Sequence, residues 1–196
     1  MITPRKNKRN ILITSALPYV NNVPHLGNII GCVLSADVWS RYCKSREYNS
    51  LYICGTDEYG TATETKAKAE NLSEREICNK YHEIHKSVYE WFNINFDYFG
   101  RTSTENPKED TQWNQTIISQ KIFNQLVDNN LLIEKTIQQL YCCEMKTFLA
   151  DRYISGTCPH CNYENANGDQ CDNCSKLLDP LELINPLCKI NPEYSL

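Results

Sequence analysis

The chain has 196 residues, of which 41% are hydrophobic, so it can bury the core of one large domain or of one domain with an insertion. Its net charge of −4 excludes an overall polybasic surface, and composition alone gives no reason to expect a nucleic-acid partner. No apolar run has the length of a membrane span or the composition of a secretion signal. We therefore expect a cytoplasmic protein whose eleven cysteines are metal ligands and buried thiols.

Residues 1–10 form a basic stretch, which we expect to be a disordered tail. Residues 11–13 follow as a short apolar run of the kind found in strands that are covered on both faces. Turn-forming residues occupy 17–22, and a helical pattern starts at about His25. This order predicts a strand, a turn and then a helix that begins beyond the carboxyl end of the strand.

The predicted start of this helix contains His25, Gly27 and Asn28. Free backbone N–H groups and the helix dipole at such a position favour a bound phosphate. A nucleotide site is our first hypothesis, although the chain has neither a GxGxxG fingerprint nor a GxxxxGK[ST] loop. The alternative is a strand, a turn and a helix with an incidental histidine.

Residues 26–44 repeat apolar side chains at steps of three and four, which predicts an amphipathic helix packed on a sheet. The expected buried face consists of Ile29, Ile30, Val33, Leu34, Val38, Trp39 and Tyr42. Asp37 and Arg41 are four residues apart, and we expect them to pair on the outer side of the helix.

A second buried strand is expected near residues 49–54, and Asp57 lies just past its end. In an open parallel sheet this edge faces the ligand, so a carboxylate there is a candidate for binding a cation or an ammonium group. The alternative for Asp57 is an N-cap of the next helix.

Two helices are expected next, at residues 61–71 and from Glu74 to about Phe92, with a capping box at 73–76. His82 and His85 could share a face of the second helix. We expect both to be structural or surface histidines, because no HExxH pattern and no obvious partner carboxylate accompanies them.

Residues 92–102 alternate apolar and polar side chains, which predicts a strand or an extended segment. A further helix is expected at 108–129, followed by a third short strand at 131–133. The expected buried face of that helix is Trp113, Ile117, Ile118, Ile122, Phe123, Leu126 and Val127.

Two CxxC pairs separated by nine residues predict one structural zinc site. The four thiolate ligands would be Cys158, Cys161, Cys171 and Cys174. Four protein ligands close the coordination shell, which argues against hydrolytic zinc chemistry. We expect His160 to point outward. An RNA-binding zinc knuckle of an unrelated type is the alternative, but the acidic residues here disfavour it, namely Asp169, Asp172 and Asp179.

The stretches ALPYVNNVPHLGN, at residues 16–28, and GTDEYGTATETKA, at residues 55–67, resemble the class I aminoacyl-tRNA synthetases, specifically the methionyl-tRNA synthetase family of the eukaryotic cytosolic type. HLGN stands where the class has its HIGH signature, with Asn28 in place of the last histidine. FLADRY and the paired CxxC motifs extend the resemblance to about Cys188.

The resemblance implies contacts with two substrates. The residues expected at ATP are Pro18, His25, Gly27 and Asn28, of which His25 and Asn28 would be catalytic. The residues expected at methionine are Ala16, Leu17, Tyr19 and Asp57, with Asp57 pairing with the α-ammonium group.

A second zinc site of the family is expected to be lost. The family carries CxxC twice more, around Cys142 and Cys143 and around Cys188, but here Met145 and Asn191 replace one thiolate of each pair. Weak or neutral ligands should abolish high-affinity zinc binding, so we predict one zinc ion instead of two.

The resemblance also implies the fold class, which is α/β, with a Rossmann-like parallel sheet of the class I synthetase type and a zinc-knuckle insertion. The expected parts are the tail 1–10, the first half of the catalytic domain at 11–139, the zinc-binding connective insertion at 140–187, and at 188–196 a truncated return to the catalytic domain.

The implied activity is methionine–tRNA ligation, with methionine, ATP with Mg²⁺ and tRNA(Met) as substrates. The chain ends before any KMSKS-like lysine loop or anticodon-binding domain, so we expect it to be inactive unless the C-terminal half is supplied in cis or in trans. The alternative is a non-catalytic synthetase-like fragment or a tRNA-binding scaffold with a structural zinc knuckle.

Overall fold

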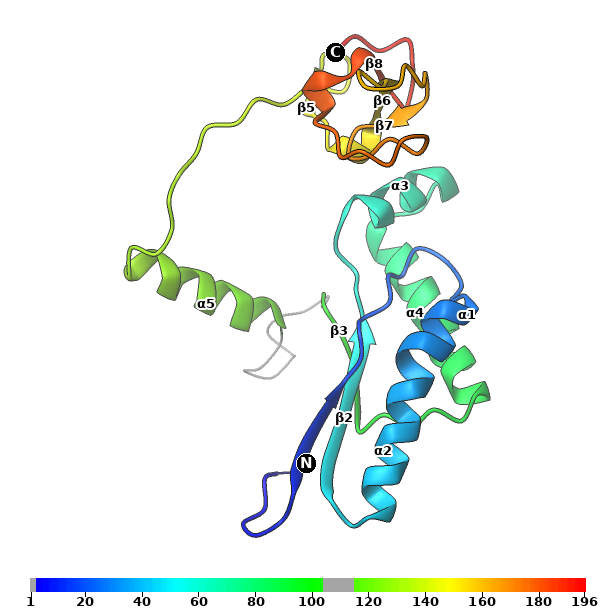
Figure 1. The fold of residues 1–196 in the computed structure, drawn as a ribbon, viewed down its shortest axis with the longest axis vertical. Helices are drawn as coiled ribbons and strands as arrows, with labels where there is room; N and C mark the ends of the chain where they lie inside the picture. The colour runs from blue at the N-terminus through cyan, green and yellow to red at the C-terminus, as the bar shows by residue number, and fades with distance from the viewer. Residues whose placement is uncertain (1–2, 104–114) are drawn as a thin grey trace. The chain divides into compact units, whose positions relative to one another are not determined.

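The computed structural model describes residues 3–103 and 115–196, and it divides into two compact units, residues 1–131 and residues 132–196 (Figure 1). The predicted tail contains a turn at residues 6–8, and the side chain of Asn10 accepts a hydrogen bond from the backbone N–H of Arg5 at 2.8 Å. The domain boundary predicted at residue 10 stays a prediction.

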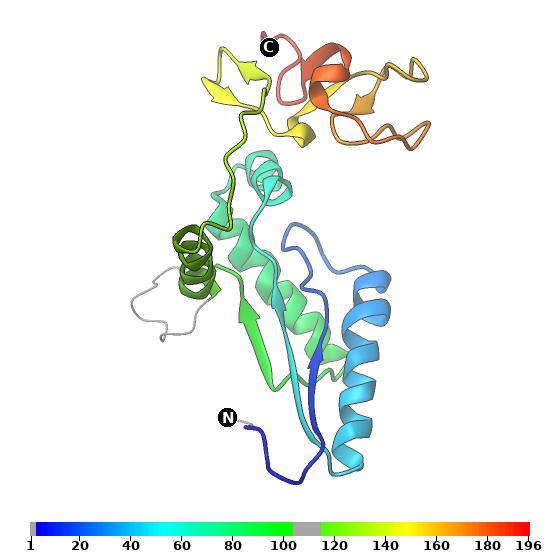
Figure 2. The same ribbon diagram turned by 60° about the vertical axis from the view of Figure 1, so that its left-hand side comes forward.

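The first unit contains a parallel sheet of three strands in the order β1 (Asn10–Thr14), β2 (Asn49–Thr56) and β3 (Tyr98–Arg101) (Figure 2). The strands predicted at 11–13 and 49–54 are thus confirmed, and the strand or extended segment predicted at 92–102 is a strand at 98–101 and a turn at 92–93. Gly55 is paired with Gly100, and a Cβ on Gly55 would lie 2.6 Å from the carbonyl oxygen of Gly100. Only glycine allows β2 and β3 to approach this closely.

Parallel strands need crossover connections, and helices supply both of them. The first crossover is continuous helix, made of α1 (Leu26–Asn28), the π-helical segment Ile29–Leu34 and α2 (Ser35–Ser45). The second contains α3 (Thr61–Glu70) and α4 (Glu74–Trp91), with the predicted capping box between Ser73 and Glu76 present. Helices α2 and α4 run along the same side of the sheet (Figure 1, Figure 2).

The buried face predicted for residues 26–44 is only partly correct. Ile29 and Val33 are buried, but Ile30, Val38, Trp39 and Tyr42 are exposed. Asp37 pairs with Arg41 at 2.6 Å as expected, yet it is only 1% exposed instead of lying on the outer side. Its carboxylate also accepts the backbone N–H of Asn95 at 3.0 Å. Asp37 is therefore buried because it has a hydrogen-bond partner from outside the helix.

The last part of the first unit differs most from expectation. Helix α5 (Gln115–Asp128) forms, but it contains no buried residue, and the side chains expected to be buried are partly or largely exposed. Trp113 and the predicted start at residue 108 lie outside the described residues. Residues 131–133 form no strand, and Ile133 is 95% exposed. The helix was predicted correctly and its buried face was not, because an apolar period cannot show that a partner surface is present.

The second unit is built of short antiparallel strands. A hairpin joins β4 (Tyr141–Cys142) to β5 (Thr147–Phe148). A second sheet has the order β7-β6-β8, formed by Ala166–Asn167, Ile154–Thr157 and Ile184–Cys188. Single 3₁₀ turns occur at Asp151–Tyr153 and Pro180–Glu182. Across the part of the chain that the structure describes, no helix is both long and apolar enough to span a membrane.

Candidate functional site

The loop after β1 and the end of β2 are joined by backbone hydrogen bonds. Asp57 N–H donates to the Pro18 carbonyl at 2.9 Å, and Val20 N–H donates to the Asp57 carbonyl at 3.2 Å. These bonds place Tyr19 directly opposite Asp57 as an isolated parallel bridge. Two residues that lie 38 positions apart in sequence are therefore adjacent at the carboxyl edge of the sheet, where open α/β sheets bind ligands.

The carboxylate of Asp57 is available to a ligand. The residue is half-buried, and within residues 3–103 and 115–196 no hydrogen bond or ion pair engages its side chain. Tyr19 is 57% exposed and Leu17 is 42% exposed, so the same edge offers apolar surface. Ala16 is exposed, and its carbonyl accepts Cys32 Sγ at 3.2 Å. An open carboxylate beside apolar side chains suits a ligand with an ammonium group and an apolar side chain.

His25 caps the first helical turn. Its Nδ1 accepts the backbone N–H groups of Gly27 at 3.0 Å and Asn28 at 3.4 Å, and Asn28 Oδ1 accepts the backbone N–H of His25 at 3.2 Å. These N–H groups are thus occupied, although we expected them to be free for a phosphate. Since Nδ1 accepts, a neutral His25 ring carries its proton on Nε2, which is the remaining donor of this exposed side chain.

Gly27 is required by this cap. A Cβ at position 27 would lie 2.8 Å from His25 Cε1 and 3.0 Å from His25 Nδ1. Any other residue would push the ring away from the backbone N–H groups that it accepts. The HLG sequence therefore has a local physical reason in addition to any contact with a ligand.

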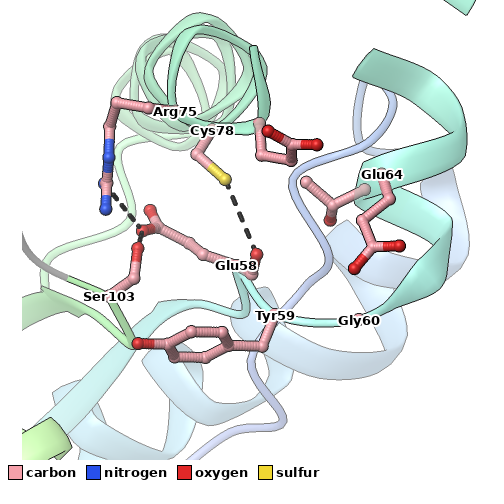
Figure 3. A pocket seen from close by; sticks show the side chains of 9 residues that line it. Glu58, Tyr59, Gly60, Glu64, Arg75, Cys78 and Ser103 are labelled. Carbon is pink, nitrogen blue, oxygen red and sulfur yellow. Dashed lines mark hydrogen bonds and ion pairs between the residues drawn. The ribbon is translucent and has the colours of Figure 1, made fainter. Parts of the chain in front are cut away.

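Glu58, which follows Asp57, was not identified from the sequence as a functional residue. Its side chain is completely buried, and it lies against a cavity of about 350 Å³ (Figure 3). Its carboxylate accepts Arg101 Nε at 2.5 Å and Thr56 Oγ1 at 3.1 Å, and it also accepts the Ser103 hydroxyl. A glutamate next to an aspartate in the sequence gives no hint of such burial, because Arg101 and Ser103 lie 43 and 45 residues away.

The two histidines of α4 have structural contacts, as predicted. His82 Nδ1 lies 2.8 Å from the Thr56 hydroxyl. His85 Nε2 lies 2.9 Å from the Asn22 carbonyl, to which it donates, and its Nδ1 lies 3.1 Å from the Tyr89 hydroxyl. Burial lowers the pKa of both imidazoles. His85 thereby ties α4 to the loop that precedes His25.

The four predicted zinc ligands converge in the second unit. The Sγ atoms of Cys158, Cys161, Cys171 and Cys174 all lie within 4.8 Å of one another. The separations between Cys158 and Cys174, 3.9 Å, and between Cys161 and Cys171, 3.6 Å, are far longer than a disulfide. They fit the edges of a tetrahedron with zinc–sulfur bonds of about 2.3 Å, whose sulfur atoms would be about 3.8 Å apart.

Two N–H donors point at sulfur atoms of this cluster. His160 N–H donates to Cys158 Sγ at 3.4 Å, and His160 itself is not part of the cluster. The Asn173 amide, 3.6 Å from Cys161 Sγ, contributes most to lowering the pKa of that thiol. The donor set thus fits a closed structural zinc site.

The region of the predicted lost site retains one knuckle-like contact. Met145 N–H donates to Cys142 Sγ at 3.5 Å, as a backbone amide does in a CxxC turn. Cys142 and Cys188 are fully buried in the core of the second unit, and Cys143 is exposed. That this region binds no second zinc stays a prediction.

Comparisons with known proteins agree with one another. The family model described as tRNA synthetases class I (M) matches residues 11–195. The chain is 65% identical over 188 residues to a probable cytoplasmic methionine–tRNA ligase of Dictyostelium discoideum, covering 95% of this chain and 24% of that relative. It is 60% identical over 199 residues to the cytoplasmic methionine–tRNA ligase of Saccharomyces cerevisiae, covering 99% and 25%.

Among solved structures, Mycobacterium tuberculosis methionyl-tRNA synthetase in complex with methionyl-adenylate aligns with a TM-score of 0.63 at 16% identity, over 86% of this chain and 30% of that chain. This likeness shows the fold. The chain spans about a quarter of the length of the curated relatives it matches.

Proposed function

The chain belongs to the class I tRNA synthetases of the methionyl type, and from this premise we propose that it supplies the methionine- and ATP-binding half of a cytoplasmic methionine–tRNA ligase. The observation that carries the proposal is the β-bridge between Tyr19 and Asp57. Tyr19 precedes the helix cap His25 by six residues. The bridge places the Asp57 carboxylate beside Tyr19, in the loop that leads to His25 and its ring Nε2–H donor.

The proposed reaction is attack of the methionine carboxylate on the α-phosphorus of ATP, which gives methionyl adenylate and pyrophosphate, followed by transfer to tRNA(Met). The carboxylate is already ionised, so the first step needs no general base. Orientation and charge stabilisation must then supply most of the rate enhancement.

Each proposed residue has a role in that orientation. Asp57 binds the α-ammonium group, while Ala16, Leu17 and Tyr19 line the methionine side. His25 donates from Nε2 to the ATP phosphates, with Pro18, Gly27 and Asn28 shaping the loop around them. Mg²⁺ enters with ATP as part of the substrate.

The zinc ion belongs to a different part of the molecule in this proposal. Cys158, Cys161, Cys171 and Cys174 would hold one Zn²⁺, which supplies cross-linking of the second unit and no chemistry of the reaction. Residues 140–187 are proposed to be the connective insertion of the catalytic domain. Transfer to tRNA is proposed for the whole ligase, since the chain spans about a quarter of the length of the relatives it matches.

Ligand-dependent melting tests the proposal. L-methionine and Mg-ATP should each raise the melting temperature of the chain, because a ligand that binds only the folded state stabilises it. A protein that is only a scaffold would show no shift with either ligand. The variant Asp57→Asn should lose the methionine shift and keep the ATP shift, since the amide cannot balance an ammonium charge.

A further inference from the structure

The carboxylate of Glu58 has no free position for a ligand. A carboxylate offers about four acceptor sites, and four groups surround this one. They are the Thr56 hydroxyl, the Arg101 Nε, the Ser103 hydroxyl and the Arg75 guanidinium, whose Nη1 lies 3.5 Å away. Figure 3 shows the contacts with Ser103 and Arg75. With the side chain fully buried as well, Glu58 can act on a ligand only through its neighbours.

The most direct neighbour is Asp57. Side chains alternate in direction along an extended chain, and Thr56 and Glu58 are bonded to each other on one side of it. Asp57, between them, therefore projects to the opposite side. Burying its two neighbours in one polar cluster holds the Asp57 carboxylate outward.

The backbone around Asp57 is tied on both sides as well. The backbone of Asp57 bonds to Pro18 and Val20 in the signature loop, which we define as the loop between β1 and α1, residues 15–25. The next N–H, that of Glu58, donates to Thr102 Oγ1 at 2.9 Å. The cluster thus joins β2 to the end of β3. It also reaches α4, because Arg101 Nη2 donates to Asn79 Oδ1 at 2.7 Å.

We propose that Glu58 is a positioning residue for the amino-acid site: its buried ion pairs with Arg101 and Arg75 fix the end of β2 so that Asp57 faces the α-ammonium group of the substrate. The identity of that substrate rests on the proposed function above. The claim that Glu58 holds the backbone bonds between Asp57 and the signature loop is geometric, and it does not depend on the proposed function.

The variant Glu58→Gln tests the proposal because it keeps the shape of the side chain and removes its charge. Arg75 and Arg101, whose side chains are 31% and 28% exposed, then lose a fully buried counter-ion, and the ion pairs that join the end of β2 to β3 and α4 weaken. This weakening should open the nearest backbone hydrogen bonds. These are the bond from Asp57 N–H to the Pro18 carbonyl and the bond from Val20 N–H to the Asp57 carbonyl.

Amide hydrogen exchange measures this opening without any ligand. In Glu58→Gln the amides of Asp57 and Val20 should exchange about tenfold faster or more, relative to the amide of Tyr52 in the middle of β2. A general loss of stability would accelerate all three amides alike. Equal acceleration, or none, would overturn the proposal.

Glu70→Gln is a matched control. Glu70 likewise has several charged and polar partners, accepting Lys66 at 3.1 Å, Lys80 at 2.6 Å and the Tyr81 hydroxyl at 2.9 Å, but it lies at the end of α3. Its loss should leave the relative exchange of Asp57 unchanged.

Affinity measurements on the same variants connect the geometry to the ligand. Glu58→Gln should weaken L-methionine binding by about tenfold, the size of a displaced charge-assisted hydrogen bond, and leave the affinity for Mg-ATP unchanged. Unchanged methionine affinity in this variant would contradict the positioning role while leaving the proposed function intact. If the wild-type chain binds neither ligand, the proposed function fails, and amide exchange still decides the geometric part.

Discussion

The two nitrogens of the His25 ring have different tasks. Nδ1 holds the first helical turn by accepting two backbone N–H groups, and Nε2 is left to face the solvent. A sequence motif in which histidine precedes glycine thus combines a helix cap with a donor that can meet a phosphate. Asn28 divides its amide in the same way, because its Oδ1 completes the cap and its Nδ2 stays available.

Replacing His25 should therefore affect both stability and ligand binding. His25→Ala is expected to lower the free energy of unfolding by about 1 kcal/mol, the typical value of an N-cap, and to abolish the ATP-dependent melting shift. Urea unfolding and melting curves with and without Mg-ATP measure the two effects. An unchanged unfolding free energy would show that the cap is not formed in solution.

Asn28→Asp separates the same two effects. Aspartate keeps the acceptor oxygen that the cap uses and suits the positive end of a helix, so the unfolding free energy should change by less than about 0.5 kcal/mol. It removes the donor and adds a negative charge, so the ATP shift should be lost. Retention of the full ATP shift in Asn28→Asp would exclude Asn28 from the phosphate site.

His82 and His85 give the first unit a defined pH dependence. Burial lowers the pKa of both in the folded state, so folding favours their neutral forms. The associated stability is complete above the ordinary histidine pKa of about 6.5 and is lost as the pH falls below it toward the lowered values. The urea midpoint should decrease between about pH 6.5 and pH 5, and His85→Gln should reduce that decrease. Equal slopes in both proteins would contradict the burial of His85.

Helices, strands and motifs could be predicted where the residues that determine them are close together in the sequence. The positions of the first two strands, the capping box at Ser73 and the cysteine spacing could all be predicted, because each depends on residues close in sequence. The parallel pairing of the strands joins residues about 40 positions apart, and it was expected from the family resemblance. Asp37 was misplaced because its partner, the backbone N–H of Asn95, is 58 residues away. Glu58 was missed for the same reason.

Helix α5 and residues 131–133 show the opposite limit. Their apolar residues are present in the predicted pattern, but no described surface covers them. A sequence pattern states which face requires burial. It does not state whether the burying surface lies in the same stretch of chain.

The zinc content of the chain should depend on the four clustered cysteines and not on the other cysteines. Purified chain should contain one zinc ion, and Cys161→Ser should lose it, since three thiolates bind more weakly than four. Cys143→Ser, which alters an exposed cysteine outside the cluster, should retain it. Zinc is measured by atomic emission on the dialysed proteins. Two zinc ions in the wild type, or a zinc loss in Cys143→Ser, would revive the second site around Cys142 and Cys188.

In the whole molecule, the proposed substrate-binding residues and the metal-ligating residues lie in different compact units. The first unit carries the bridged loop, the His25 cap and the Glu58 cluster, and the second carries the metal ligands. The class I family model matches residues 11–195 and so covers most of both units. In the proposed function only the first unit recognises the substrates.

The central claim is that Tyr19 and Asp57 form the amino-acid site, and an NMR titration of the isotope-labelled chain with L-methionine tests it most directly. The account predicts saturable shifts of the Tyr19, Val20 and Asp57 amides, no shifts at Cys158 to Cys174, and loss of the effect in Asp57→Asn. Saturable shifts that persist in Asp57→Asn, or that fall only in the second unit, would contradict it.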